Sequence, residues 1–277
     1  MSEELAVTLL GTGSPRPTLE RSGPSQLVHV GDEMFLVDCG DGATTQLLRA
    51  RLDPSRVTKL LFTHLHTDHT LGYGQFVIGG WTSGRRALSV WGPKGLARLT
   101  DGLFKDLYKE DIEYRLTLGV GRTSAGLWDI DVHEIGPGLV IEDGGYSISA
   151  TEVEHSIYTL AYRFESGGRA LVIGGDTVYC LGLVNLARGA DVLVQDCTVS
   201  PHLGPIPSQL QSRMESLSRH HATPRSAGRM AREAGVRKIV LTHLLADIDS
   251  DRVAREVAEE FDGEVVIGED LMRIGCW

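Results

Sequence analysis

Short runs of β-branched and other apolar residues recur along the whole chain, and most of them end at a Gly, Asp or His. Runs of about four to eight such residues between turn-forming residues predict strands. They fall into two comparable groups, one before about residue 95 and one after about residue 145. The predicted strands are Leu5–Leu10, Met34–Val37, Val57–Phe62, Ala87–Val90, Tyr146–Thr151, Ala170–Ile173, Asp191–Val194, Arg237–Leu241 and Glu264–Ile267.

Helical segments separate many of these strands. The predicted helices are Ala43–Arg51, Lys94–Leu107, Leu181–Arg188, Pro224–Ala234 and Asp251–Phe261. The fourth has the clearest ends, because Thr223 is a suitable N-cap, Pro224 suits the first helical position and Gly235 suits the C-terminal end. Strands outnumber helices and come in two groups, which favours an α/β sandwich of two packed sheets with helices outside.

The 277 residues show no break in composition, so we expect one domain spanning 1–277. Residues 104–128 fit neither the strand pattern nor the helix pattern, and they carry Tyr108, Tyr114 and Trp128. We interpret this stretch as an insertion. It either covers the functional site or decorates the surface, and the sequence leaves both open.

The charge balance argues against a protein drawn to polyanions. The chain has 27 Lys and Arg against 37 Asp and Glu, a net charge of −10. A local basic groove stays open, but nucleic acid is not the favoured partner. No apolar run approaches bilayer length and no leader-like segment opens the chain, so we expect a cytoplasmic protein without a membrane partner.

The four cysteines are scattered, without the spacing of a disulfide framework or a cysteine zinc site. Cys39 follows an apolar strand beside Asp38 and could be a nucleophile, but a buried packing role is favoured.

Three histidines and one aspartate crowd into Thr63–His69, directly after a predicted strand. Imidazole and carboxylate are the ligands that zinc, manganese or iron accept. A loop leaving a strand can turn His64 and His66 toward one metal while Asp68 and His69 face another. An exposed polar loop would not need this density of histidine. The sequence therefore predicts a metal site here.

Other strand ends offer more ligands, which a second metal would require. His155 follows the strand ending at Thr151, Asp176 follows Leu171–Gly175, and His243 follows Ile239–Thr242. Each alone would more often be a turn cap or a buried core side chain. Together, at equivalent strand ends, they are better explained as ligands.

At this point the chain resembles the metallo-β-lactamase superfamily, from Leu9 to about Leu245. Its His-x-His-x-Asp-His signature matches His64, His66, Asp68 and His69. The resemblance implies an αββα sandwich of two mixed β-sheets flanked by helices, with two divalent metals, zinc first and manganese or iron as alternatives. It implies His64, His66 and His155 on one metal, Asp68, His69 and His243 on the other, and a bridging Asp176.

Three further segments are similar to the ribonuclease Z family. Pro17–Ser22 resembles its Pro-x-x-x-Arg-Asn loop, with Ser22 in place of Asn, and His155–Phe164 resembles its third histidine segment. His221-Ala222-Thr223 is similar to the segment that carries its proton-donating histidine. On this basis His221 and Asp68 are the candidate catalytic residues, with His220 as a solvated neighbour.

One departure from the family bears on the substrate. Members that process tRNA carry a long arm between the third histidine and the bridging Asp, but here only residues 156–175 separate His155 from Asp176. That interval is too short for a strand pair plus an arm. We therefore expect a small phosphodiester substrate to be preferred over precursor tRNA.

The chemistry that these residues predict is hydrolysis by a hydroxide held between two metals. A phosphodiester is favoured because Arg21 and Arg163 could bind its phosphate, although both could equally pair with nearby carboxylates. A lactone, ester or amide is the first alternative, and tRNA 3′-end endonucleolytic cleavage is the second. A serine hydrolase is disfavoured because no Gly-x-Ser-x-Gly occurs. A homodimer is one option for the assembly.

Overall fold

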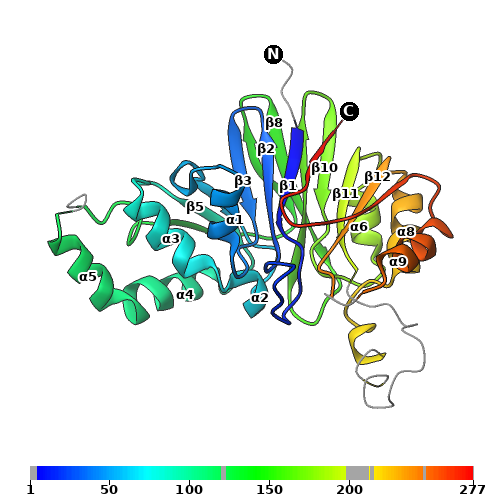
Figure 1. The fold of residues 1–277 in the computed structure, drawn as a ribbon. Helices are drawn as coiled ribbons and strands as arrows, with labels where there is room; N and C mark the ends of the chain where they lie inside the picture. Colours follow the sequence, from blue (N-terminus) through cyan, green and yellow to red (C-terminus); the bar gives the residue numbers. More distant parts are fainter. Residues whose placement is uncertain (1–4, 120–122, 198–211, 213–214, 246–247, 277) are drawn as a thin grey trace.

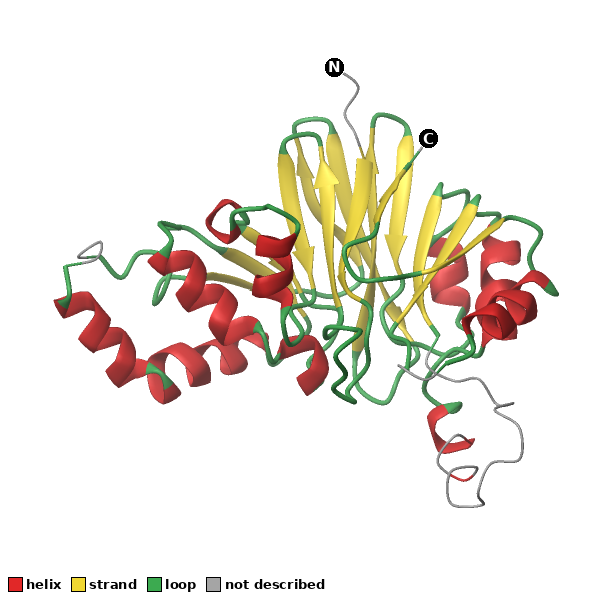
Figure 2. Ribbon diagram, viewed as in Figure 1, coloured by secondary structure: helices red, strands yellow, loops and turns green. Residues whose placement is uncertain are grey.

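The computed structural model describes residues 5–119, 123–197, 212, 215–245 and 248–276. Within these residues two seven-stranded sheets pack face to face, and helices cover both outer surfaces. Figure 1 shows α1 and α3 outside one sheet and α6, α8 and α9 outside the other, and Figure 2 shows the resulting order of helix, sheet, sheet and helix. The expected αββα sandwich of two mixed sheets is confirmed.

The first sheet has the order β14-β1-β2-β3-β4-β5-β6. Its first part is antiparallel, from β14 to β3, and the rest is parallel. The last strand of the chain thus pairs with the first. In spatial order the strands are β14 (Arg273–Gly275), β1 (Leu5–Gly11), β2 (Ser25–Val30), β3 (Glu33–Val37), β4 (Lys59–Leu61), β5 (Ser89–Gly92) and β6 (Asp131–Glu134).

The second sheet has the order β13-β12-β11-β10-β9-β8-β7. Strands β10 to β13 are parallel, whereas β7 to β10 form antiparallel hairpins. In spatial order the strands are β13 (Glu264–Ile267), β12 (Lys238–Thr242), β11 (Val192–Asp196), β10 (Arg169–Ile173), β9 (Thr159–Ser166), β8 (Tyr146–Val153) and β7 (Gly138–Asp143).

The helices of the described residues are mostly short. They are α1 (Ala43–Arg49), a 3₁₀ turn (Pro54–Arg56), α2 (Thr67–Thr70), α3 (Tyr73–Thr82), α4 (Leu96–Asp101), a π-helical segment (Gly102–Leu107), α5 (Lys109–Thr117), α6 (Leu181–Leu186), α8 (Pro224–Ala234) and α9 (Ser250–Ala258). Helix α8 has the predicted ends: Thr223 accepts from the Ser226 N–H in a capping box, and Gly235 adopts a left-handed conformation.

Strand alternation divides the buried side chains into three clusters. Val28 and Val240 face the space between the sheets, whereas Leu27 faces the layer of α1 and α3 and Leu241 faces α8 and α9. Successive strand residues point to opposite faces, so each central strand is buried on both sides. Each large side chain buried in this way contributes roughly 1.5–3 kcal/mol to folding.

Several elements were not predicted. Strands β2, β6, β7, β9 and β14 and helix α3 were missed, and the predicted helix Lys94–Leu107 divides into α4 and the π-helical segment. Helix α3 contains Gly74, Gly79 and Gly80, which lower helix propensity. The burial of α3 compensates for this low propensity, because Phe76 and Trp81 lie in the core. Glycine is also needed at position 80, since a Cβ there would clash with the buried Arg85 guanidinium.

The stretch 104–128, predicted as an insertion, is partly helical. With α4, the π-helical segment and α5 form an arm that projects from the outer end of the first sheet (Figure 1). Leu107, Tyr114 and Leu118 are exposed on this arm. Phe104 is buried, and its carbonyl accepts a hydrogen bond from Trp128 Nε1 at 3.1 Å.

Asp270 ties the loop after β1 to the C-terminal segment. Its carboxylate accepts from Thr12 N at 2.9 Å, Thr12 Oγ1 at 2.8 Å, Ser22 N at 2.7 Å and Gln46 Nε2 at 2.8 Å. These charge-assisted bonds fix the start of the chain against residues close to its end.

No helix among the described residues is long and apolar enough to cross a membrane.

Four glycines pack backbone against backbone beneath the Thr63–His69 loop. A Cβ on Gly11 would lie 1.9 Å from Gly23 O, and one on Gly40 would lie 2.5 Å from Gly23 C and 2.6 Å from Asp68 O. A Cβ on Gly72 would lie 2.2 Å from Gly40 O. Only glycine permits such close approach. The four glycines therefore allow the loops to cross directly beneath the segment that carries the histidines.

Candidate metal centre

The Thr63–His69 segment leaves the end of β4 and turns directly into α2. The loop carries His64 and His66, while Asp68 and His69 lie on α2. The other candidates come from the second sheet: His155 follows β8, Asp176 follows β10 and His243 follows β12. Strand ends of both sheets meet at this edge, so the structure brings all seven predicted ligands together.

Three imidazoles converge in the first group. His66 Nδ1 lies 3.0 Å from His64 Nε2 and 3.3 Å from His155 Nε2. Burial lowers the pKa of His64 well below its usual range, lowers that of His66, and lowers that of His155 to about 4. Three neutral ring nitrogens directed at one point are a suitable donor set for a divalent metal.

The second group contains Asp68, His69 and His243. His243 Nε2 lies 3.1 Å from Asp68 Oδ2, and His69 Nε2 lies 3.6 Å from the same oxygen. His69 Nε2 is fully buried and has no hydrogen-bond partner among the described residues. Because a buried unpaired nitrogen is unfavourable, a metal ion is the partner that this nitrogen fits.

Asp176 lies between the two groups. Its Oδ2 is 3.8 Å from His64 Nε2, 3.5 Å from His69 Nε2 and 3.3 Å from His243 Nε2. Burial alone would raise the pKa of Asp176, but His243 and His69 outweigh burial and hold it well below its usual range. The carboxylate is therefore ionised and central to both donor sets.

Asp38 was not predicted to take part. It accepts from His69 Nδ1 at 2.8 Å and from Thr63 N and Oγ1, each at 2.8 Å. Its backbone is left-handed, with φ of 57°. Donation from Nδ1 leaves His69 Nε2 as the nitrogen available to a metal. Burial opposes the charged form of His69, but Asp176 and Asp38 outweigh it and raise its pKa well above the usual range, so a metal at Nε2 would take the place of a proton.

Asp196 was also missed. It follows the pattern of the other candidates, because it ends β11 at the same edge, but its sequence context carries no histidine. His221 Nδ1 donates to Asp196 Oδ2 at 3.1 Å. Burial opposes protonation of His221, but the bond to Asp196 and the charge of Asp176 raise its pKa. His220 is exposed and contributes its carbonyl, which accepts from His155 Nδ1 at 2.7 Å.

A pocket of about 450 Å3 opens beside the cluster. Side chains from both sheets line it, among them Leu65, His66 and Asp68 from the first half of the chain and His221 and His243 from the second. No lining residue comes from the described part of 104–128.

Comparison with known proteins decides the family. Residues 33–244 match the model described as a beta-lactamase superfamily domain. The chain belongs to the metallo-β-lactamase superfamily. It is 34% identical to the ribonuclease Z of Mycobacterium bovis (strain BCG / Pasteur 1173P2) and to that of Mycobacterium marinum (strain ATCC BAA-535 / M), over 98% of this chain and 98% of each relative.

Solved structures agree with this assignment. The metallo-beta-lactamase fold protein YhfI from Bacillus subtilis superimposes with a TM-score of 0.76 at 22% identity, covering 98% of this chain and 99% of that one. Human tRNase Z, short form, superimposes with a TM-score of 0.70 at 24% identity and the same coverage. The predicted resemblance to the ribonuclease Z-like branch of the metallo-β-lactamase superfamily is confirmed, and the protein is a hydrolase.

Within this superfamily member, the interval between His155 and Asp176 holds only the antiparallel pair β9 and β10. The two strands are joined at Gly167 and Gly168, which both adopt positive φ. All of residues 156–175 are described, so no arm occupies this interval.

The two predicted substrate-binding arginines are not brought into the cluster. Arg21 Nη1 donates to Thr12 Oγ1 at 2.6 Å and to Gly268 O at 2.7 Å. Arg163 Nη1 donates to the carbonyls of Leu186, the last residue of α6, and of Arg188, and its Nη2 donates to Glu165. Both guanidinium groups bind protein atoms, and a role in binding substrate stays a prediction for each.

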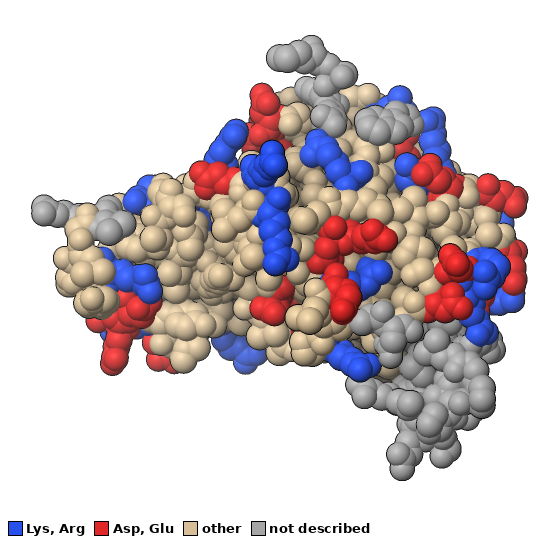
Figure 3. Space-filling model, in the orientation of Figure 1, with Lys and Arg blue, Asp and Glu red and all other residues tan. Residues whose placement is uncertain are grey.

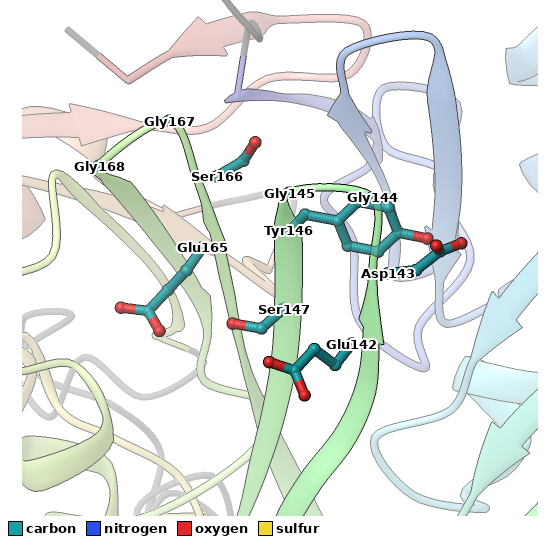
Figure 4. A pocket seen from close by; sticks show the side chains of 10 residues that line it. All are labelled: Glu142, Asp143, Gly144, Gly145, Tyr146, Ser147, Glu165, Ser166, Gly167 and Gly168. Carbon is teal, nitrogen blue, oxygen red and sulfur yellow. The ribbon is translucent and has the colours of Figure 1, made fainter.

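A second hollow lies at the other end of the second sheet (Figure 4). It is formed by the turns between β7 and β8 and between β9 and β10, with Glu142, Asp143 and Glu165 around it. Tyr146 begins β8 and Val153 ends it, so the hollow is roughly 25 Å from the histidine cluster. Its carboxylates belong to an exposed acidic rim, and the hollow is not part of the candidate centre.

Proposed function

We propose that this protein is a binuclear metal-dependent phosphodiesterase. The observation that carries the proposal is that two donor sets around Asp176 share a pocket with His221, whose Nδ1 is bonded to Asp196. Such an arrangement provides for activation of a nucleophile on one side and protonation of a leaving group on the other.

The chemistry of the donor atoms indicates which residues would hold each metal. His64, His66 and His155 would hold one divalent ion, and Asp68, His69 and His243 the other, with Asp176 shared. Nitrogen-rich sets of this kind favour zinc, with manganese or iron as alternatives. When bound, two such ions acidify water and stabilise negative charge that develops on the substrate.

The chain's own residues perform the remaining steps. Asp38 and the His220 carbonyl orient His69 and His155, so that the Nε2 atoms face the centre. Asp196 accepts from His221 Nδ1, and this bond favours the protonated ring because it raises the pKa of His221. His221 Nε2 then donates its proton to the leaving-group oxygen. Asp68 would contribute to catalysis as a ligand of the second metal, beside His243, whose Nε2 lies 3.1 Å from its Oδ2.

The class of bond follows from the relatives. The curated relatives are named ribonuclease Z, and these names concern phosphodiester cleavage. We favour small phosphodiesters over precursor tRNA, because the net charge is −10 and residues 156–175 form only a tight hairpin. In Figure 3 basic and acidic side chains are interspersed on the visible face. RNA is the second candidate substrate because of the relatives' names.

The test uses protein reconstituted with zinc or manganese. Hydrolysis of bis(p-nitrophenyl) phosphate, a precursor tRNA and an acyl lactone should be measured at equal ionic strength, since nucleic-acid affinity depends on salt. We expect the phosphodiester to be cleaved with the highest kcat/KM. His243→Ala should abolish the activity, and His220→Ala, which preserves the backbone carbonyl, should retain most of it.

Two results would contradict the proposal. Cleavage of the lactone without cleavage of either phosphodiester would reassign the chain to carbonyl substrates. Efficient 3′ cleavage of precursor tRNA, with little action on the small substrate, would keep the phosphodiesterase chemistry but overturn the substrate preference.

A further inference from the structure

A small cavity lies behind the histidine cluster, between the two sheets. It has a volume of about 10 Å3, which is near the roughly 10–15 Å3 needed for one water. Gln26 lines it from the first sheet and Thr242 from the second, and the carboxylates of Asp38, Asp176 and Asp196 complete its wall. The proposed phosphodiesterase activity assigns no role to this cavity.

Strand alternation explains why polar side chains meet here. Val28 on β2 and Val240 on β12 point into the core between the sheets. Gln26 and Thr242 lie two residues from them on the same strands, so they share that inner face. At the ligand-bearing edge, both sheets therefore place an oxygen-bearing side chain where the rest of this layer is hydrocarbon.

Both side chains are left with an unpaired oxygen. Gln26 is 3% exposed and Thr242 is 6% exposed. Gln26 Oε1 and Thr242 Oγ1 have no hydrogen-bond partner among the described residues. Buried polar atoms without partners are rare in folded proteins and strongly unfavourable, so something in the cavity should bond to them.

We propose that a single water molecule occupies this cavity and links the two sheets behind the metal centre. Thr242 Oγ1 donates to the water, and the water donates one hydrogen to Gln26 Oε1. Its second hydrogen is directed to the carboxylates that line the cavity. The water thereby satisfies both orphaned oxygens, and the site is a property of the folded chain that does not depend on metal.

A water suits this site better than the other occupants. A hard divalent cation needs about six or more oxygen ligands, which a cavity of about 10 Å3 between these few side chains does not supply. The hydroxyl hydrogen of Thr242 needs an acceptor, which no cation can be. An empty cavity is expected only where the walls are apolar, and this wall carries three carboxylates.

The first test is a crystal structure at high resolution, both with metals bound and after chelation. We expect one fully occupied water within hydrogen-bond distance of Gln26 Oε1 and Thr242 Oγ1 in both states. An empty cavity, an ion with a higher coordination number, or a Gln26 side chain that fills the space would each overturn the proposal. A water present only with metals would contradict its independence from the centre.

The second test measures stability of the chelated protein, so that metal affinity does not enter. Thr242→Val removes the hydroxyl but keeps the shape, and it should lower the folding equilibrium constant about tenfold because the water loses a partner. Thr44→Val is the matched control. Thr44 is buried with an unpaired Oγ1 but does not line the cavity, so its substitution should be neutral or stabilising.

A double-mutant cycle makes the second test specific. Gln26→Met alone should also lower the folding equilibrium constant. In the double variant with Thr242→Val, the fold-decrease in that constant should be clearly smaller than the product of the two single fold-decreases, because each substitution removes a partner of the same water. If Thr242→Val behaves like Thr44→Val, or if the two effects simply multiply, no shared water joins these residues.

Discussion

His221 has two possible roles at the residue scale. It lies within reach of Asp176 and His155 as a fourth donor group, and it is also bonded to Asp196 as a proton donor would be. His221→Ala should retain both metals but lose roughly two to four orders of magnitude in turnover on alkyl phosphodiesters. The loss should be much smaller on p-nitrophenyl substrates, which need little protonation. Metal content and both rates are the measurements.

The control for this prediction is the neighbouring His220→Ala. His220 is exposed where it lines the pocket and orients His155 through its carbonyl, so loss of its side chain should cost much less turnover than loss of the His221 side chain. Loss of metal from His221→Ala, or equal impairment on the two substrate types, would make His221 a ligand or a packing residue instead.

Asp196 should set the pH range in which His221 is active. Its bond to Nδ1 and the charge of Asp176 raise the pKa of His221, so the protonated ring persists above its usual pH range and is lost as pH rises through the raised value. Asp196→Asn keeps an acceptor but removes the charge. The alkaline limb of kcat/KM against pH should then move to lower pH, with a several-fold loss at alkaline pH and a smaller loss at acid pH. If the alkaline limb does not shift, the titration of His221 is not its cause.

The seven candidate ligands could be predicted from the sequence because four of them crowd into Thr63–His69 and the other three are a histidine or aspartate that follows an apolar strand. Asp38 also follows an apolar strand, but from the sequence it was considered only as the neighbour of Cys39. Asp196 lies in a segment without histidine, and its importance depends on a residue 25 positions away. Asp38 and Asp196 are recognised by their hydrogen bonds to His69 and His221, and those bonds exist only in the folded chain.

At the scale of elements, the glycine crossing beneath the cluster should be intolerant of any side chain. Gly40→Ala should lower the free energy of unfolding by about 3 kcal/mol, since its Cβ would meet three backbone atoms within 2.7 Å. Because one of them is Asp68 O, metal affinity should fall too. Gly102→Ala, where the Cβ meets nothing within 4 Å, is the control and should be neutral or mildly stabilising. Denaturation and metal titration measure both effects; equal stabilities would contradict the crossing.

The elements that the sequence did not predict share a physical cause. Strand β2 carries Ser25, Gln26 and His29 without a regular alternation of polar and apolar residues, and all three are buried in the folded chain. Strand β6 is short and lies at a sheet edge, where pairing with β5 maintains it. Tertiary pairing decides such segments, and local propensity carries little information about it.

For the whole molecule, we predict two metals per chain. The two donor sets have no residue in common, and each joins residues from the first half of the chain to one from the second, with Asp176 between them. Elemental analysis after reconstitution should give two ions, and Asp68→Ala or His243→Ala should remove the second before the first. A single ion in the reconstituted wild type would contradict this prediction.

The pairing of β14 with β1 and the four bonds to Asp270 have a consequence for biosynthesis. A nascent chain emerges from the ribosome with its N-terminus first, and whole domains generally fold as units. Here the first loop requires a carboxylate that lies 258 residues beyond Thr12 in the sequence. The nascent chain therefore completes its first sheet only after β14 and Asp270 have been synthesised, and the edge of β1 that pairs with β14 stays unpaired until then.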